Sequence, residues 1–314
     1  MRKKLLALTI LLVLLTMGYF AIRTIHSRSQ HGFKDARCEV QPSQLSSKHM
    51  RIVSLAPSIT EILFMLGLGD EVVGVTRYCT YPPEAREKPK IGGYYDPNYE
   101  AIVVLHPDLV VMLTEHEEPS LNLGKMGLKT LVVDHRNING ILNSISSIGM
   151  ACGRVREAMI AVGDLRTRME KVRRAIKGLA RPRVMVTVGR NMGSSGIEDV
   201  YISGRGGFYS ELITLAGGIN AYEGDITYPS FSEEGIMRIN PTVIIDMVPD
   251  LGEKALDKNT VIRQWCNLSR VDAVRNSRVY VFCQDYTVIP GPRFINILEE
   301  MARTIHPEVH WSNS

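Results

Sequence analysis

The sequence repeats part of itself at a constant distance, and this repetition limits the folds that the chain can adopt. The stretch 100–112 recurs as 234–246: each begins with a glutamate and carries a proline just before an apolar run. The stretch 60–67 recurs as 210–217, keeping the glutamate and the final glycine. Repetition of this kind is typical of a structural unit that occurs twice. We therefore predict two similar lobes.

Both lobes are predicted to alternate strands with helices. Short apolar runs that predict strands occur at 52–55, 72–75, 109–113, 129–134 and, in the second half, 184–188. Between the first two runs, Ser58 and Glu61 have the spacing of a capping box, and Gly67 is placed to end that helix. Asn98 is the expected cap of the next helix. This alternation predicts an α/β fold with mostly parallel sheets.

One long amphipathic helix is predicted between the lobes. From 144 to about 177 the apolar residues recur at steps of three and four, and they are Val155, Met159, Val162, Leu165, Met169, Val172 and Ile176. A helix of about thirty residues would be about 45 Å long, which is enough to join two domains. We therefore assign 51–143 to an N-terminal lobe, 144–180 to a linking helix and 181–314 to a C-terminal lobe.

The N-terminus has the pattern of a membrane-targeting segment. Arg2, Lys3 and Lys4 precede an apolar run over 5–22, which is just long enough to span a bilayer. No Ala-x-Ala follows this run, and Cys38 is too distant to be a lipoprotein cysteine. We expect residues 1–30 to be an uncleaved signal anchor, the alternative being a cleaved signal peptide. Residues 31–50 would form a polar tether to a body on the periplasmic or extracytoplasmic face.

Charge and cysteine content exclude several classes of protein. The 314 residues carry a net charge of +4, but residues 1–30 supply five basic residues and no acid, so the rest of the chain is at −1. Such a body has no broad basic surface for nucleic acid. The five cysteines form no CxxC pair, which leaves no visible zinc or redox motif. Cys266 and Cys283 are the nearest pair for a disulfide in an oxidising compartment.

The predicted ligand site lies where the strands end. Ligands of α/β proteins bind at the carboxyl ends of strands and between domains. Seven of the twelve tyrosines fall in or beside the corresponding loops. Tyrosines in this number indicate a wide cleft that holds a large flat ligand by its aromatic surface, with phenol groups free to form hydrogen bonds.

Several motifs resemble one known family over nearly all of the chain after residue 50. They are Ser-Leu-Ala-Pro-Ser-Ile-Thr-Glu-Ile-Leu (54–63), Gly-Val-Thr-Arg-Tyr-Cys-Thr-Tyr-Pro-Pro-Glu-Ala (74–85), Lys-Ile-Gly-Gly (90–93), His-Pro-Asp-Leu-Val-Val (106–111), Gly-Gly-Phe-Tyr-Ser-Glu-Leu-Ile-Thr-Leu-Ala-Gly-Gly-Ile-Asn-Ala (206–221) and Pro-Gly-Pro-Arg (290–293). Their order and spacing resemble the vitamin B12- and siderophore-binding family of ABC-importer receptors. The resemblance implies two lobes on one rigid helix, and an ABC permease in the membrane as partner.

The resemblance also implies which residues dock to the permease. One glutamate on each lobe contacts basic residues of the permease, and the matching positions here are Glu100 and Glu234. These are the same two glutamates that the internal repeat selects. Paired carboxylates on two lobes would set the orientation and rate of docking more than its affinity.

The resemblance places four residues in a corrinoid-binding cleft. Tyr78 matches a family tyrosine, Tyr94 and Tyr228 stand where vitamin B12 binders have tryptophan, and Asp285 matches an acid before the last helix. At a further tryptophan position this chain has Leu113. The leading hypothesis is therefore a corrinoid, although every family tryptophan is replaced.

A ferric siderophore or haem is the alternative ligand. It would draw on Arg77, Arg190 and Arg205 to bind carboxylates and on a tyrosinate to bind iron. Pro57, in the loop after the first strand, completes the expected lining. The histidines of the first lobe show no spacing of a zinc site, so direct binding of a bare metal ion is not expected.

An enzyme is not expected. Gly204, Gly206 and Gly207 match neither G-x-G-x-x-G nor a P-loop, and the chain has no G-x-S-x-G elbow. We predict a monomeric binding protein without a cofactor of its own, whose small-molecule ligand is a cobalt or iron chelate. A membrane-tethered ligand sensor without transport is the remaining alternative.

Overall fold

The computed structural model describes residues 50–192, 196–249, 251 and 256–311. The predicted anchor and the predicted tether up to residue 49 lie outside the described residues. Among the helices that the structure describes, none is both long and apolar enough to cross a membrane. The described body is one compact unit that contains both predicted lobes.

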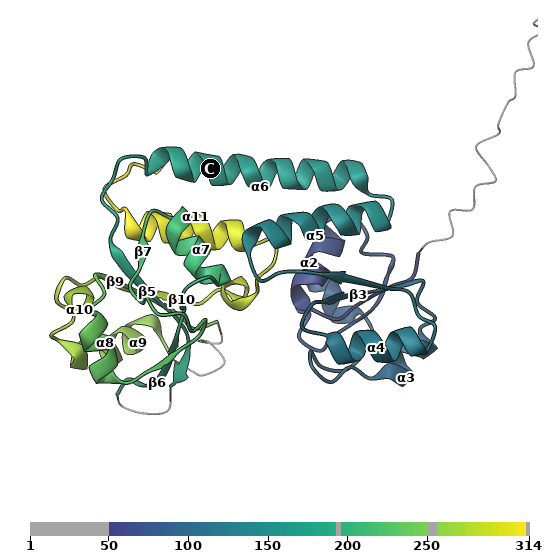
Figure 1. The fold of residues 1–314 in the computed structure, drawn as a ribbon, viewed down its shortest axis with the longest axis horizontal. Coiled ribbons are helices and arrows are strands. Elements are labelled where there is room, and N and C mark those ends of the chain that lie inside the picture. The colour runs from purple at the N-terminus through teal and green to yellow at the C-terminus, as the bar shows by residue number, and fades with distance from the viewer. Residues whose placement is uncertain (1–49, 193–195, 250, 252–255, 312–314) are drawn as a thin grey trace, which may run out of the picture. The chain divides into compact units, whose positions relative to one another are not determined.

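The N-terminal lobe is built on a four-stranded parallel sheet (Figure 1). Its strands are β1 (Ile52–Ser54), β2 (Val72–Val75), β3 (Leu109–Leu113) and β4 (Thr130–Val133), in the order β2-β1-β3-β4. Its helices are α2 (Pro57–Met65), η1 (Pro83–Glu87), α3 (Tyr99–Val104) and α4 (Glu117–Lys125). The strands occur where the apolar runs predict them, and β3 is buried along its whole length.

The C-terminal lobe has a larger, mixed sheet. Its strands are β5 (Arg183–Asn191), β6 (Glu198–Ile202), β7 (Ile219–Asn220), β8 (Ser230–Phe231), β9 (Val243–Met247) and β10 (Val279–Phe282). They are ordered β10-β9-β5-β6-β8, with β7 beside β5 and with β6 and β8 antiparallel. Its helices are α7 (Phe208–Leu215), α8 (Glu233–Ile239), α9 (Lys258–Trp265), η2 (Cys266–Leu268), α10 (Asp272–Arg275), η3 (Asp285–Val288) and α11 (Phe294–Ile305).

The structure confirms that the lobes repeat one unit. In α3 the side chain of Asn98 caps the helix by accepting a hydrogen bond from the N–H of Ala101, and in α8 Ser232 does the same for Gly235. Both helices are followed by a non-glycine residue in the left-handed region, His106 with φ 43° or Asn240 with φ 41°. A proline and a fully buried five-residue strand follow in each lobe. The 134-residue offset thus holds for the caps, the turns and the strands.

The predicted linking helix is wrong in its start and its length. Instead of one helix from 144, the chain forms α5 (Ile138–Ala151) and then α6 (Val155–Ala175). Gly153, with φ +69°, lies in the turn between them. The helices pack so closely that a Cβ on Gly149 would stand 2.5 Å from the Cβ of Ala158. The chain passes from one lobe to the other through α6, whose 21 residues make it about 31 Å long.

Part of the predicted apolar stripe faces water. Leu165 and Val172 are buried as expected, but Val155 is 49% and Met159 71% exposed. Ala158 is buried instead. The reason is that α6 packs on α5 near its start and on α11 and α7 further along (Figure 1). Its buried side therefore follows the neighbouring helices and not one straight stripe.

Candidate functional site

The first two predicted ligand residues lie at the strand ends of the N-terminal lobe. Tyr78 follows β2 and is 54% exposed, so its ring is available to a ligand. Tyr94 is partly buried, and its ring packs edge-on against His116 and Tyr95 at centroid distances of 4.6 and 4.7 Å. Burial raises the pKa of the Tyr94 phenol, so this group stays protonated and can donate a hydrogen bond.

Pro57 is the first residue of α2, but the predicted capping box beside it is wrong. The N-cap is Ala56, and no side chain caps the helix. The hydroxyl of Ser58 lies 2.8 Å from Nδ1 of His135, and Glu61 pairs with Arg293. Both side chains of the expected box are therefore used for tertiary contacts.

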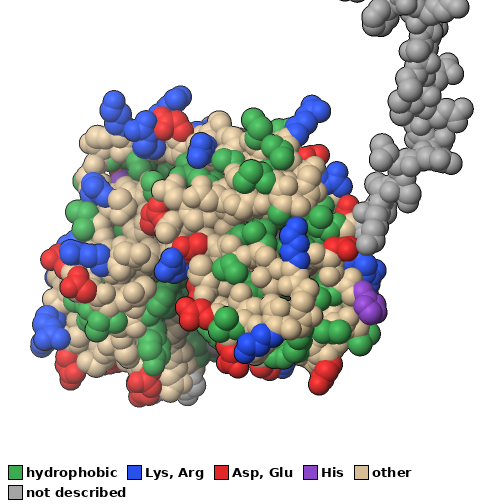
Figure 2. Space-filling view, turned by 45° about the vertical axis from the view of Figure 1, so that its right-hand side comes forward, with side chains coloured by type: hydrophobic (Ala, Val, Ile, Leu, Met, Phe, Trp, Pro, Cys, Tyr) green, Lys and Arg blue, Asp and Glu red, His purple; other side chains and the backbone are tan. Residues whose placement is uncertain are grey.

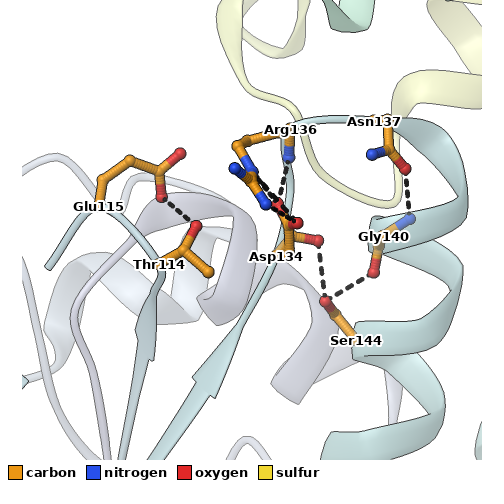
Figure 3. A network of polar contacts seen from close by, with 7 residues as sticks. All are labelled: Thr114, Glu115, Asp134, Arg136, Asn137, Gly140 and Ser144. Carbon is orange, nitrogen blue, oxygen red and sulfur yellow. Dashed lines mark hydrogen bonds and ion pairs between the residues drawn. The ribbon is translucent and has the colours of Figure 1, made fainter. Parts of the chain in front are cut away.

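Polar side chains also follow β3 and β4, and Figure 3 shows them at one edge of the sheet. The guanidinium of Arg136 binds Asp134 through two nitrogens, and Arg136 itself is two-thirds exposed. Thr114 donates a hydrogen bond to Glu115 after β3. Sequence reasoning did not select Asp134 or Arg136, although their place directly after an apolar strand could have indicated them.

Two buried histidines stand behind this edge. His116 is 1% and His135 2% exposed, and in each the Nε2 atom has no hydrogen-bond partner among the described residues. Burial lowers the pKa of both imidazoles, that of His135 to about 4. They are therefore neutral at physiological pH. The described residues hold no group of three His, Cys, Asp or Glu side chains that could bind a metal ion.

In the C-terminal lobe, Tyr228 is the predicted aromatic contact. It is 46% exposed and lies in the loop between β7 and β8, just before β8 begins. Burial of part of its ring raises the pKa of its phenol. Nearby Tyr209 is buried and donates a hydrogen bond to the carbonyl of Thr287, so it holds the loop before α11 in place.

Asp285 belongs to an ion-pair cluster that crosses between the lobes. Arg293, just before α11, contacts Asp285 at 2.9 Å and Glu61 of α2 at 2.6 Å. The guanidinium also stacks on Tyr81, 3.9 Å from the ring centre. Asp285 is half exposed, while Glu61 is 4% exposed. The predicted acid is thus present at the lobe boundary, with Arg293 beside it.

Arg190 does not belong to the site, and its prediction as a ligand contact is wrong. Its side chain is 1% exposed and lies inside the C-terminal lobe. It donates to Asp246 at 2.9 Å and to Gln264 at 2.7 Å. A guanidinium buried in this way stabilises the lobe and cannot reach a ligand. Of the other two arginines, Arg77 is paired with Asp96 on the surface and Arg205 is exposed.

Two further expectations concern Cys266, Cys283 and Leu113. The two cysteines, the nearest pair in the sequence for a disulfide, are free in the structure. Cys266 ends α9 on the surface, while Cys283 follows β10. Leu113 is 3% exposed at the end of β3, so it contributes no large surface to a ligand.

The two glutamates that the resemblance assigns to docking occupy equivalent places. Glu100 lies in the first turn of α3 and Glu234 in the first turn of α8, and both are exposed. A carboxylate there is favoured by the positive end of the helix dipole. In Figure 1, α3 and α8 lie at the side of the body opposite α6. Both carboxylates are therefore available to one partner surface.

These lobes, joined by one helix and carrying aromatic side chains at the ends of their strands, have the architecture of a binding protein for a solute. The sequence profile of the family described as "Periplasmic binding protein" matches residues 52–286. The chain belongs to this family. It is therefore a substrate-binding component of an ABC importer, which works with a membrane permease and is not an enzyme.

Curated relatives extend over most of the chain. It is 29% identical over 276 residues to an uncharacterized ABC transporter substrate-binding lipoprotein of Bacillus subtilis (strain 168), covering 85% of this chain and 83% of that one. It is 26% identical over 254 residues to the vitamin B12-binding protein of Vibrio cholerae, covering 80% and 87%.

Solved structures show the same fold. The periplasmic vitamin B12 binding protein of Vibrio cholerae superposes with a TM-score of 0.70 at 24% identity, over 82% of this chain and 96% of that one. The periplasmic heme-binding protein of Roseiflexus sp. RS-1 gives the same TM-score and identity, over 82% and 98%. Equal likeness to proteins with different ligands leaves the ligand to be argued from the residues of this chain.

Proposed function

We propose that this protein captures a corrinoid between its lobes and delivers it to the permease of an ABC importer. The observation that carries the proposal is the set of tyrosines in the loops beside the two sheets, Tyr78 and Tyr94 on one lobe and Tyr228 on the other. Tyr78 and Tyr228 are about half exposed and Tyr94 is partly buried, and Figure 2 shows the surface hollowed between the lobes. Flat rings with a polar edge suit a large macrocycle that carries amide groups.

The protonation of the phenols supports this choice of ligand. Burial raises the pKa of Tyr94 and Tyr228 above that of an exposed tyrosine, which is itself neutral at physiological pH, so the tyrosinate form is disfavoured further. A neutral phenol donates a hydrogen bond to an amide or carbonyl oxygen of the ligand. Iron ligation by tyrosinate would require the opposite, because the phenol must lose its proton to bind the metal.

Haem or a ferric siderophore is the second candidate. Arg77 and Arg205 are exposed near the strand ends and could bind carboxylates of such a ligand. Arg136, which Figure 3 shows beside Asp134, is a third exposed guanidinium. Of these arginines, the two on the N-terminal lobe are paired, Arg77 with Asp96 and Arg136 with Asp134, so the carboxylates of an anionic chelate would compete with these aspartates.

Docking to the permease would use Glu100 and Glu234. Their equivalent positions on the repeated unit give two exposed carboxylates on one side of the body. We also propose that residues 1–30 remain as an uncleaved membrane anchor. A binding protein held at the membrane in this way stays close to its permease, as a lipoprotein does. A tethered sensor would share the anchor but would not need the two carboxylates.

The test is a calorimetric titration of the purified full chain with cyanocobalamin, cobinamide, haem and two ferric siderophores. We expect one-to-one, submicromolar binding of the corrinoids alone. Tyr94→Ala and Tyr228→Ala should each weaken binding at least tenfold, because each removes ring surface from the ligand. Tyr201→Ala, which removes an exposed tyrosine from β6, is the matched control and should bind normally.

Other outcomes separate the alternatives. Binding of haem or a ferric siderophore would support the receptor function but contradict the assignment of a corrinoid as the ligand. No binding of any chelate by a well-folded sample would favour the tethered sensor.

A further inference from the structure

A second hollow lies on another part of the body, where the two lobes meet α6. It has a volume of about 770 Å³, and its lining comes from α2, from α6, from the loop after Tyr78 and from the start of α11. We call it the hinge groove. A volume of this size is ordinary for a small-molecule site. Because the lining includes both lobes and α6, an occupant would contact all three parts of the body.

The hinge groove has an apolar surface that water reaches. Phe64 and Met65 come from α2, Ile160 and Leu165 from α6, and Ile295 from α11. Met65 is 39% and Ile160 62% exposed. Figure 2 shows hydrophobic side chains along the upper edge of the body, where α5 and α6 run. Covering exposed side chains of this size with an apolar ligand is favourable by roughly 25 cal/mol per Å².

Its charge is negative. The two cations that line it are neutralised, Arg168 by Glu299 at 2.9 Å and Arg293 by Glu61 at 2.6 Å. Three further carboxylates line the groove and are exposed: Glu84, Glu157 and Asp164. None of these three side chains forms a hydrogen bond or an ion pair with another residue in the described part of the chain.

Glu61 and Tyr81 add an inner polar wall. Glu61 is 4% exposed, and its Oε2 atom has no hydrogen-bond partner among the described residues. Tyr81 is 44% exposed, and one face of its ring is covered by Arg293. An aromatic ring beside carboxylates is a favourable environment for an organic cation.

We propose that the hinge groove is a second ligand site, which binds a small organic cation with an apolar body. The alkyl or aryl part would cover Ile160, Met65 and Phe64, and the ammonium would lie among Glu84, Glu157 and Asp164. The site is distinct from the predicted cleft, because its lining includes none of Tyr78, Tyr94, Tyr228 and Asp285. It does not depend on which chelate the cleft takes.

The test uses the full chain in lipid nanodiscs, titrated calorimetrically with tetrabutylammonium against empty nanodiscs as the blank. We expect saturable, one-to-one binding with a submillimolar dissociation constant. Tetramethylammonium, which keeps the charge and lacks the alkyl arms, should bind at least tenfold more weakly. Benzenesulfonate, an apolar anion, should not bind.

The variants locate the site. Glu157→Gln combined with Asp164→Asn should weaken tetrabutylammonium about fivefold to tenfold, since exposed charge pairs contribute modestly. Glu198→Gln combined with Asp199→Asn removes two exposed carboxylates from β6 and is the matched control. Unchanged binding in the first pair, equal loss in the control pair, or no saturable binding in the native chain would each overturn the proposal.

Discussion

The two lobes share a backbone plan but differ in what they bury at its centre. Met112 on β3 and Asp246 on β9 are equivalent in the repeat, and both are almost completely buried. Met112 lies in an apolar cluster. Asp246 instead accepts hydrogen bonds from Arg190 and from the indole of Trp265, each at 2.9 Å.

The difference follows from the lengths of the neighbouring strands. In the C-terminal lobe β5 has nine residues, and its extension brings Arg190 beside Asp246. In the N-terminal lobe β1 has three residues and ends at Ser54, so it supplies no such partner. One backbone unit therefore tolerates an apolar or a charged centre, provided that the neighbouring strand supplies the matching side chain.

The largest effect is expected from breaking the charged centre. Asp246→Ala leaves the Arg190 guanidinium buried without its carboxylate, which should lower the free energy of unfolding by about 3–5 kcal/mol. Urea denaturation followed by circular dichroism measures this loss. Met112→Leu at the equivalent position conserves volume and should cost less than about 1.5 kcal/mol. Similar losses at both positions would contradict the difference between the lobes.

The N-terminal lobe is expected to be the acid-sensitive one. Burial holds the pKa of His135 at about 4, below the ordinary 6.5, so the unfolded chain takes up the proton first. This stabilisation is complete above pH 6.5 and is lost as the pH falls toward 4, by about 3 kcal/mol.

Denaturation curves at several pH values test this expectation. His135→Asn should flatten the profile between pH 6.5 and 4, while His310→Asn, an exposed histidine, should leave it unchanged. An unaltered profile in His135→Asn would place the acid sensitivity elsewhere.

The proposed docking role of Glu100 and Glu234 can be tested on each lobe separately. Glu100→Ala and Glu234→Ala should each slow association with permease-containing vesicles about tenfold, and together about a hundredfold, because each removes an exposed charge from the encounter. Ligand affinity should not change. Raising the salt concentration should reduce the native rate toward that of the variants. A loss in only one variant would mean that docking depends on one lobe.

The smallest effect is expected at the helix caps. Asn98→Ala should cost about 1 kcal/mol of stability, because a first-turn N–H loses its acceptor. Ser232→Ala should cost less, since its bond to the N–H of Gly235 is 3.4 Å long, compared with 2.9 Å for Asn98. Asn98→Asp and Ser232→Thr keep an acceptor and serve as controls in thermal denaturation.

Much of the fold could be predicted because it depends on local order in the sequence. The strand at 109–113, the Asn98 cap and the turn at Gly67 follow from periodicity and capping chemistry within a few residues. The repeat extended these predictions to the second lobe, and family resemblance supplied Glu100 and Glu234. The break between α5 and α6 was missed, because the stripe continues through Gly153 and only the packing of two helices ends it.

The sequence by itself therefore determined the repeated α/β unit, its caps and the tyrosines at its strand ends. Only the tertiary structure decided the partners of the charged side chains. Arg190 pairs with Asp246, which is 56 residues away in the sequence. Glu61 pairs with Arg293, which is 232 residues away. Local patterns cannot specify such pairs, because they depend on which strands and helices become neighbours once the apolar surfaces are buried.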